Sequence, residues 1–384
     1  MAQEVRAPTI AIVAGEPSGD LLASLLVTAV HRLRPDARFV GVAGPRMQAA
    51  GVECLFPVEK LAVRGYVEVL RHYLEIVGIR RSLRARWLKE PPDLFIGVDA
   101  PDFNLGLELD LRRHAIPTVH YVSPSIWAWR PKRMRKIRAA VSHMLALLPF
   151  EATLYEQAGV PVTFVGHPLA DMLPERPDRL AAREQLRLPR DATVVALLPG
   201  SRESELVQMA DLYVRAARLI VEQRPEAIFL VPLVNRTTRA LFEAALARES
   251  AGGLNLQLLF GHSHEALTAA NAGLVASGTA TLEAALLGCP MVITYRVPAL
   301  SYRLMWPQRR MPYVGLPNIL AGEFIVPELL QDDATPENIA QALLNLLADS
   351  VIQRRLEHRF ASMRANLRRD AANTAARVVA PMLQ

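Results

Sequence analysis

Residues 94–104 read Leu-Phe-Ile-Gly-Val-Asp-Ala-Pro-Asp-Phe-Asn, and this stretch decides the fold class. Its apolar run, residues 94–98, lies between Pro91-Pro92 and Ala100-Pro101. This pattern predicts a short strand that is buried on both faces, as in a parallel sheet. Asp99 stands at the carboxyl end of that strand. Because ligands of open α/β sheets bind beyond the carboxyl ends of the strands, we expect Asp99 to face a substrate. The alternative is that Asp99 only caps the following turn.

Short apolar runs alternate with amphipathic stretches throughout the 384 residues. Helical patterns such as 20–33 and 104–114 separate the runs, and this alternation predicts doubly wound parallel sheets. A proline-rich, charged stretch, residues 168–189, suits a linker between two domains. The predicted strands are 9–14, 38–42, 94–98, 118–122, 144–148 and 162–165 in the first half, and 193–198, 228–233, 256–260, 272–276 and 291–294 in the second.

Composition narrows the class of protein. The net charge of +6 favours acidic partners such as nucleotide phosphates, a phosphorylated substrate or an anionic lipid surface. Cys54 and Cys289 are far apart and have no metal-type spacing, so we expect free buried thiols in a reducing cytosol. Residues 1–6 do not form a secretory signal, and no apolar run reaches the roughly 20 residues of a membrane span. We expect a cytoplasmic protein, soluble or peripheral to a membrane.

Several unusual strings occur in an order that resembles one known family. They are Ile-Val-Ala-Gly-Glu-Pro-Ser-Gly-Asp (12–20), Gly-Val-Ala-Gly-Pro-Arg-Met (41–47), Asp-Ala-Pro-Asp-Phe-Asn (99–104), Thr-Val-His-Tyr-Val-Ser-Pro-Ser-Ile-Trp-Ala-Trp-Arg (118–130), Gly-His-Pro (166–168), Leu-Leu-Pro-Gly-Ser-Arg (197–202), Ser-Gly-Thr-Ala-Thr-Leu-Glu (277–283) and Leu-Pro-Asn-Ile-Leu-Ala-Gly (316–322). Spread over nearly the whole chain, they resemble the lipid-A-disaccharide synthases, which make the glucosamine disaccharide of lipid A in Gram-negative bacteria.

The resemblance implies an α/β fold of the GT-B type, with two Rossmann-like domains facing a central cleft. Residues 1–167 would bind the acceptor and touch the membrane, and residues 168–362 would bind the nucleotide sugar. The tail 363–384 is expected to pack back onto the first domain. Other GT-B enzymes that act on UDP-amino sugars, such as a 2-epimerase or the peptidoglycan N-acetylglucosaminyltransferase, are the alternative.

The resemblance also implies the reaction. The donor would be UDP-2,3-diacylglucosamine and the acceptor 2,3-diacylglucosamine 1-phosphate, joined by a β-1,6 linkage with release of UDP. An α-linked donor and a β-linked product mean inversion, which needs one base and no covalent glycosyl-enzyme. No cofactor is expected, and a homodimer is possible. Nothing in the chain resembles a nucleic-acid-binding module, so no nucleic acid is expected as a partner.

Catalytic candidates come from the first half of the chain. Asp99 is the preferred base, and Glu16 is the second candidate. Beside Glu16, Ser18 stands at a predicted helix start that could receive an anion. Further acceptor-side or loop candidates are Asp102, His120, Ser123, Trp127 and Arg130. For His120 a hydrogen-bonded scaffold role is a second interpretation. The basic run 130–138 could bind nucleic acid, contact phosphate or lipid headgroups, or form a solvated helix face, and phosphate or headgroup contact is the preferred interpretation.

Nucleotide-binding candidates come from the second half. Gly278, Thr279 and Thr281 stand where a predicted strand turns into a helix, so main-chain N–H groups there could contact a diphosphate. Glu283 lies one turn further on and could accept hydrogen bonds from ribose hydroxyls, although an acidic first turn suits any helix. In the loop 197–202, the small side chain of Ser201 leaves the main chain accessible to a ligand. Arg202 could bind a phosphate with two parallel hydrogen bonds. Asn318 is either a further ligand or a turn residue.

Residues 62–89 are expected to contact the membrane. Their first part is apolar, with candidates Val63, Val67, Val69, Leu70 and Leu74, and their second part is rich in arginine, which suits an interfacial helix near anionic headgroups. The alternative is an ordinary amphipathic helix whose apolar side chains belong to the core. No spacing of His, Cys or carboxylate residues predicts a metal site.

Overall fold

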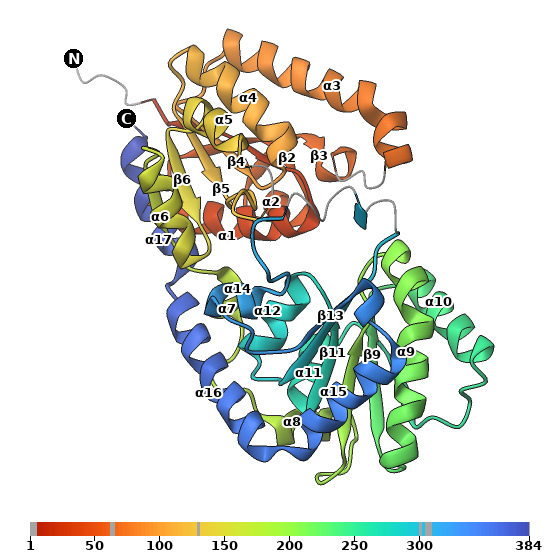
Figure 1. The fold of residues 1–384 in the computed structure, drawn as a ribbon. Coiled ribbons are helices and arrows are strands. Elements are labelled where there is room, and N and C mark those ends of the chain that lie inside the picture. Colours follow the sequence, from red (N-terminus) through yellow and green to blue (C-terminus); the bar gives the residue numbers. More distant parts are fainter. Residues whose placement is uncertain (1–5, 62–65, 129–130, 299–301, 304–308, 384) are drawn as a thin grey trace. The chain divides into compact units, whose positions relative to one another are not determined.

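The computed structural model of the protein describes residues 6–61, 66–128, 131–298, 302–303 and 309–383, with the side chains of residues 66–72 left out. The chain divides into two compact units (Figure 1). One comprises Met1–Asp171 and Leu367–Gln384, and the other comprises Met172–Asn366. Each unit is built around its own parallel sheet, so each is described separately.

The first unit contains a parallel sheet, seven-stranded among the described residues, in the order β3-β2-β1-β4-β5-β6-β7. The order reverses beside β1, where the chain passes from β3 to β4, and this makes a topological switch point between β1 and β4. Ala14 and Val98 are register partners at the carboxyl ends of these two strands. The strands are β1 (Thr9–Ala14), β2 (Arg38–Ala43), β3 (Val52–Pro57), β4 (Leu94–Val98), β5 (Thr118–Tyr121), β6 (His143–Ala146) and β7 (Val162–Phe164).

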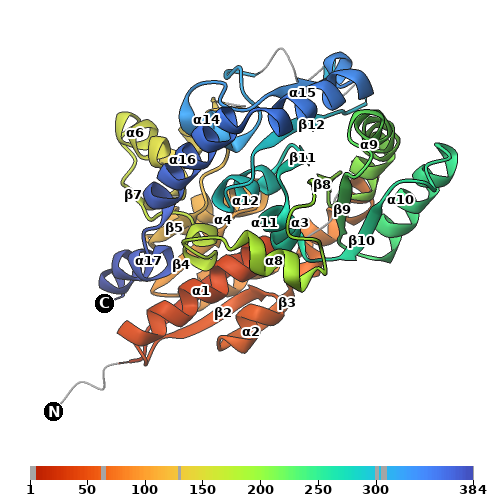
Figure 2. The same cartoon turned by 90° about the horizontal axis from the view of Figure 1, so that it is seen from below.

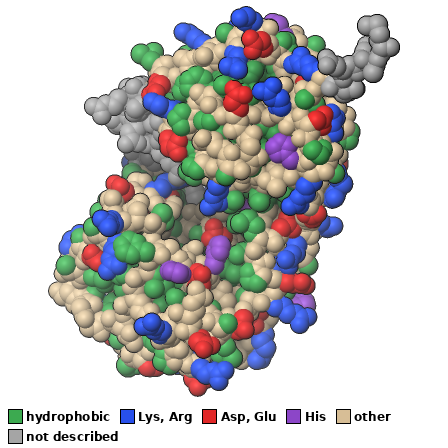
Figure 3. Space-filling model, turned by 180° about the vertical axis from the view of Figure 1, so that it is seen from behind, with side chains coloured by type: hydrophobic (Ala, Val, Ile, Leu, Met, Phe, Trp, Pro, Cys, Tyr) green, Lys and Arg blue, Asp and Glu red, His purple; other side chains and the backbone are tan. Residues whose placement is uncertain are grey.

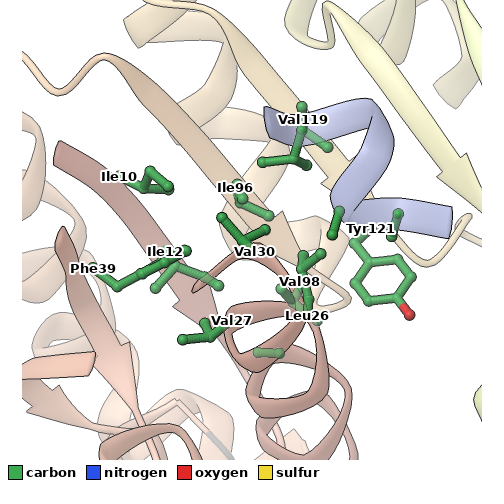
Figure 4. Close-up of a cluster of buried hydrophobic side chains, with 14 of the residues drawn as sticks. Ile10, Ile12, Leu26, Val27, Val30, Phe39, Ile96, Val98, Val119 and Tyr121 are labelled. Carbon is green, nitrogen blue, oxygen red and sulfur yellow. The ribbon is translucent and has the colours of Figure 1, made fainter. Parts of the chain in front are cut away.

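One face of this sheet carries the apolar cluster of Figure 4. Alternate side chains of β1 and β4, such as Ile10, Ile12, Ile96 and Val98, point into it. Helix α1 (Pro17–Leu33) covers this face together with α17 (Ala371–Val379), and the two helices lie side by side in Figure 2. The end of the chain therefore belongs to the core of the first unit.

The opposite face is covered by α3 (Tyr66–Lys89) and α4 (Pro101–Arg113). The intervening strand residues Ala11, Val13 and Phe95 pack here against Leu83 and Leu107. Both faces of the central strands are thus apolar, as the uninterrupted run 94–98 predicts. The remaining helices of this unit are α2 (Pro45–Ala49), α5 (Arg133–Ala140), α6 (Pro149–Gln157) and α7 (Pro168–Met172), whose last residue lies past the division.

The second unit holds a parallel sheet, six-stranded in the described part of the chain, in the order β10-β9-β8-β11-β12-β13. Its strands are β8 (Val194–Leu198), β9 (Ile228–Leu233), β10 (Leu256–Phe260), β11 (Ala272–Ala276), β12 (Met291–Tyr295) and β13 (Glu328–Leu330). Its helices are α8 (Arg179–Gln185), α9 (Glu203–Gln223), α10 (Arg236–Arg248), α11 (Ser263–Ala269), α12 (Thr279–Leu286), α14 (Leu316–Ala321), α15 (Pro336–Ala348) and α16 (Ser350–Leu367), of which the last residue belongs to the first unit.

The sequence prediction differs from this fold in a few elements. It omitted β3 and β13, an edge strand of each sheet. Edge strands need not be apolar on both sides, and Glu53 interrupts the apolar pattern of β3. The stretch 168–189, predicted as a linker, instead contains α7 and α8. Buried Arg183 of α8 donates to the carbonyl of Ala269, which ties this segment to the second unit.

None of the described helices is both long and apolar enough to cross a membrane. On the face shown in Figure 3, Lys and Arg side chains are interspersed with acidic and apolar ones.

Candidate active site

Asp99 stands directly after β4, at the switch point of the first sheet. Its main-chain N–H donates to the carbonyl of Tyr121 in β5, at 2.8 Å. Asp99 and Ala100 both have positive φ, +52° and +42°, in the region that L residues seldom adopt. The peptide therefore turns sharply at the end of the strand before α4 begins. Such backbone conformations are concentrated at functional sites.

Glu16 and Ser18 lie after β1, the neighbouring strand. Glu16 is the N-cap residue of α1, and Ser18 is exposed in its first turn. Since Ala14 of β1 is paired with Val98 of β4, the segments carrying Glu16 and Asp99 leave the sheet at the same edge. Two acidic side chains thus follow the two central strands.

Asp102 and Arg133 form an ion pair between α4 and α5. The Asp102 side chain is 79% exposed and the Arg133 side chain only 18%. Asp102 is therefore placed to hold the start of α4 against α5. Arg130, the last residue of the predicted acceptor loop, lies outside the described residues.

His120 has no exposed surface, which favours the scaffold interpretation over contact with the acceptor. Its Nδ1 lies 2.6 Å from Oε1 of Glu108 in α4, which is equally buried. Room for Glu108 comes from Gly97, the register partner of His120, because a Cβ at position 97 would lie 2.1 Å from that oxygen. Burial raises the pKa of Glu108. The pair joins α4 to β5 and acts as scaffold.

Ser123 and Trp127, on the loop after β5, share a buried network that the sequence reasoning missed. Trp127 Nε1 donates to Oε1 of Glu151 in α6, at 3.0 Å, and the Ser123 hydroxyl lies 2.8 Å from that of Tyr155. Glu151 is 3% exposed, and burial raises its pKa to about 7. No spacing could have indicated these contacts, because the partners are 24 and 32 residues apart.

The second unit contains a cavity of about 360 Å³ at the carboxyl ends of its central strands. Leu198, Ala276 and Tyr295, the last residues of β8, β11 and β12, all line it. Five of the predicted nucleotide-binding residues come together in this cavity: Ser201, Arg202, Gly278, Thr279 and Glu283. This is the position in which open α/β sheets bind their ligands.

Helix α12 begins at the wall of this cavity. Its N-cap residue is Gly278, and no side chain caps the helix start. A Cβ at Gly278 would meet no atom of the described residues within 4 Å, so this part of the chain leaves the space above the helix start open. Unpaired main-chain N–H groups and the positive end of the helix dipole make this start suitable for an anion.

At the start of α9 the corresponding N–H groups already have a partner. The Glu205 carboxylate accepts hydrogen bonds from Ser201 N at 2.9 Å and from Arg202 N at 3.2 Å. This contact was missed, although a Glu three residues after an N-cap is a capping-box signal. The Arg202 guanidinium lies 3.5 Å from Glu205 and is half exposed, so it retains donors for a ligand.

Glu283 points into the same cavity from α12. Its Oε2 lies 3.3 Å from Nε2 of His264 in α11, and this hydrogen bond raises the pKa of His264. The Glu283 carboxylate is thus held by His264. Because its side chain is still 21% exposed, it also reaches the cavity.

Two further residues predicted to bind the nucleotide, Thr281 and Asn318, make hydrogen bonds within the protein. Thr281 is fully buried, and its hydroxyl donates to the Gly278 carbonyl at 2.7 Å. Asn318 is also fully buried. Its amide donates to Val326 O and Glu328 Oε1 and accepts from Ile325 N and Val326 N. Because all four hydrogen-bonding positions of Asn318 are occupied, it fixes the loop after α14.

The predicted membrane segment is described only in part. Val63 and the side chains of Val67, Val69 and Leu70 lie outside the described residues. Leu74 on α3 is 82% exposed and its neighbour Tyr73 is 55% exposed. Further along the helix, Ile79 is only 6% exposed and packs into the core of the first unit. The end of the apolar stretch is thus core, contrary to the prediction for its whole length.

Among the described residues, no three His, Cys, Asp or Glu side chains are grouped as ligands for a metal ion. Cys54 and Cys289 are free thiols, and Cys289 is buried.

Solved structures place the fold in the GT-B class. A glycosyltransferase of kitacinnamycin is similar with a TM-score of 0.65 at 16% identity, over 99% of this chain and 100% of that one. UDP-GlcNAc 2-epimerase from Neisseria meningitidis bound to UDP-GlcNAc has a TM-score of 0.59 at 12% identity, over 98% of each chain. At such identities the likeness shows the fold alone, since this fold hosts both transferases and epimerases.

Sequence comparison resolves the class further. The family model for lipid-A-disaccharide synthetase matches residues 10–380. The lipid-A-disaccharide synthase of Methylobacillus flagellatus is 57% identical over 372 residues, which cover 97% of this chain and 98% of that protein. The chain therefore belongs to the lipid-A-disaccharide synthetase family, and it is a glycosyltransferase of lipid A biosynthesis. The recognition made from the sequence motifs is confirmed.

Proposed function

We propose that this protein transfers 2,3-diacylglucosamine from UDP-2,3-diacylglucosamine to the 6-hydroxyl of 2,3-diacylglucosamine 1-phosphate, releasing UDP. The family match over residues 10–380 carries this assignment, because it spans both sheets and every motif of the two candidate sites. The product is a β-1,6-linked disaccharide 1-phosphate formed by one inverting displacement.

The UDP part of the donor binds in the cavity of the second unit. Its diphosphate lies at the uncapped start of α12, near Gly278 and Thr279. Arg202 donates to the phosphate oxygens from the opposite loop, because its guanidinium is half exposed and lines the same cavity. These two groups stabilise the negative charge that grows on UDP as the glycosidic bond breaks.

Glu283 accepts hydrogen bonds from the ribose hydroxyls. Its carboxylate lines the cavity one turn into α12, and the contact with His264 limits its rotation. An ionised acceptor makes a stronger hydrogen bond with a hydroxyl than a neutral group does.

Asp99 is the general base that removes the proton of the acceptor hydroxyl. Its place at the switch point of the first sheet, after a fully buried strand, supports this role. Glu16, on the neighbouring segment, is the second candidate and would otherwise contact the acceptor.

The protein works at the cytoplasmic face of the membrane that holds its acylated substrates. Leu74 and Tyr73 of α3, both strongly exposed, support an apolar contact there. The contact is peripheral.

A UDP-release assay with acylated and deacylated donor tests the proposal. We expect release of UDP only when the acylated donor and the monosaccharide 1-phosphate are both present, together with a disaccharide 1-phosphate detected by mass spectrometry. Epimerised donor without disaccharide would reassign the protein to the UDP-amino-sugar epimerases.

A further inference from the structure

The turn that carries Asp99 has an unusual backbone. Asp99 and Ala100 are consecutive non-glycine residues with φ of +52° and +42°. Aspartate tolerates this left-handed region better than most residues, but alanine does not, because its Cβ approaches the following carbonyl. A pair of such residues persists only where the surrounding structure determines their conformation from several sides.

One side-chain amide lies close to three carbonyl groups at this turn. Nδ2 of Asn104 donates to the carbonyl of Asp99 at 2.8 Å. It also lies 3.5 Å from the carbonyl of Val98 and 3.4 Å from that of Val13. The same amide therefore binds the ends of β4 and β1, the two strands that flank the switch point.

The turn is also closely packed against the segment that follows β1. A Cβ at Gly15, the residue after β1, would lie 2.2 Å from the Cβ of Ala100. Only glycine at position 15 lets Ala100 approach so closely. On the other side, the main-chain N–H of Asp99 is held by the Tyr121 carbonyl.

Asn104 is itself rigidly placed. It has no exposed surface and lies in the second turn of α4, where side chains lean back toward the start of the helix. One turn further on, Glu108 is hydrogen-bonded to His120, and this buried pair joins the helix to β5. The position of the amide is thus set by the scaffold beneath the turn.

We propose that Asn104 is a positioning residue of the transfer reaction, which acts through Asp99 by holding its main chain so that the carboxylate faces the acceptor hydroxyl. The proposal rests on the proposed role of Asp99 as base. Asn104 touches neither substrate. Its amide donates a hydrogen bond to the Asp99 carbonyl at the end of the strand.

The expected effect follows from geometry. A displacement of a catalytic group by about 1 Å can cost on the order of 100-fold in rate. Asn104→Ala should therefore lower kcat by roughly 10- to 100-fold. The KM of donor and acceptor should each stay within about threefold, because neither substrate loses a contact.

A double-mutant cycle tests whether Asn104 acts through Asp99. We would measure kcat for the wild type, Asn104→Ala, Asp99→Asn and the double variant of the full-length enzyme. In the Asp99→Asn background the base is absent, so loss of Asn104 should change kcat by less than about twofold. Leu109→Ala, on the same helix but packed away from Asp99, is the control for loss of stability, and it should keep its kcat.

Three outcomes would reject the positioning role of Asn104. Equal losses in both backgrounds would show that Asn104 only supports the fold, and the positioning role would be rejected. An Asn104→Ala enzyme as fast as the wild type, with Asp99→Asn inactive, would reject the role while leaving the base in place. If Asp99→Asn lowers kcat by less than about tenfold, Asp99 is not the general base, and the positioning role of Asn104 is rejected with it. If Asn104→Ala does not fold, the same cycle is run with Asn104→Ser, which keeps a short donor.

Discussion

At the scale of single residues, a substitution of Asp99 tests the proposed mechanism most directly. Asp99→Asn keeps the shape of the side chain and removes its basicity. We expect kcat to fall about 10²- to 10⁴-fold, the usual contribution of a general base, while UDP binds as before. Steady-state rates and calorimetric titration with UDP measure the two effects.

Asp102→Asn is the matched control for that experiment. Asp102 lies three residues further on and pairs with Arg133 at the protein surface, so its replacement should cost less than about tenfold in rate. An Asp102 variant as slow as the Asp99 variant would mean that the loop, rather than one carboxylate, carries the effect.

Arg202 and Glu283 are predicted to bind different parts of the nucleotide. Removing one partner of a charged hydrogen bond costs about 1.5–3 kcal/mol, which weakens binding roughly 10- to 150-fold. Arg202→Ala should weaken the binding of UDP but leave that of uridine nearly unchanged. Glu283→Ala should weaken the binding of both.

Calorimetric titration of each variant with UDP and with uridine separates the two roles. Arg215→Ala is the control. Arg215 lies on α9, the helix that begins directly after Arg202, but it pairs with Glu249 away from the cavity. Unchanged UDP affinity in the Arg202 and Glu283 variants would place the nucleotide elsewhere.

At the scale of elements, Glu151 joins α6 to the loop that carries Trp127. Burial raises its pKa from 4.5 to about 7 in the folded protein. Between these values the folded protein keeps a proton that the unfolded chain has released. The free energy of unfolding should therefore fall as the pH rises from about 4.5 through about 7, by up to about 3 kcal/mol.

Glu151→Gln should flatten this pH dependence, although the lost hydrogen bond lowers stability at every pH. Urea unfolding curves at pH 5 and pH 8, which include most of this window, measure the slope. Glu156→Gln, exposed on the same helix, is the control and should keep the wild-type slope. A wild-type slope in the Glu151 variant would assign the pH dependence to other groups.

Strands were easier to predict from the sequence than side-chain networks. The residue limits of β1, β4, β9, β10 and β11 agree with the prediction because these strands show as apolar runs within one segment. The contact of Glu151 with Trp127 and that of Asn104 with Val13 carry no such local signal, because the partners are 24 and 91 residues apart and only the fold brings them together. The four contacts of Asn318 are with residues 7 to 10 positions away, and they follow no periodic pattern either.

At the scale of the whole molecule, the positive charge that faces the leaving UDP comes from the protein itself in the proposed mechanism. Arg202 and the start of α12 provide it. We expect activity to persist in excess EDTA, measured as UDP release after dialysis. Restoration of an EDTA-treated enzyme by Mg²⁺ or Mn²⁺ would show that a metal ion carries the charge.

Attachment to a membrane is the last property that the proposed function predicts for the whole molecule, since the proposed substrates are acylated. Leu74 and Tyr73 of α3 are 82% and 55% exposed. Transferring one large apolar side chain from water contributes roughly 1.5–3 kcal/mol. Loss of the pair should therefore weaken the affinity for vesicles by at least about tenfold. Leu74→Ser with Tyr73→Ser should reduce co-sedimentation with anionic vesicles and leave the melting temperature unchanged, because neither side chain is part of the core.

Two control variants complete this experiment. Val207→Ser removes a side chain that is 62% exposed on the second unit, and it should not change sedimentation. Leu83→Ser removes a core contact of the same helix, because Leu83 is 1% exposed, and it should lower the melting temperature by several degrees. If the double variant sediments like the wild type, the exposed part of α3 is not the membrane contact. If it unfolds instead, Leu74 and Tyr73 support the fold, and α3 is an ordinary core helix along its whole length.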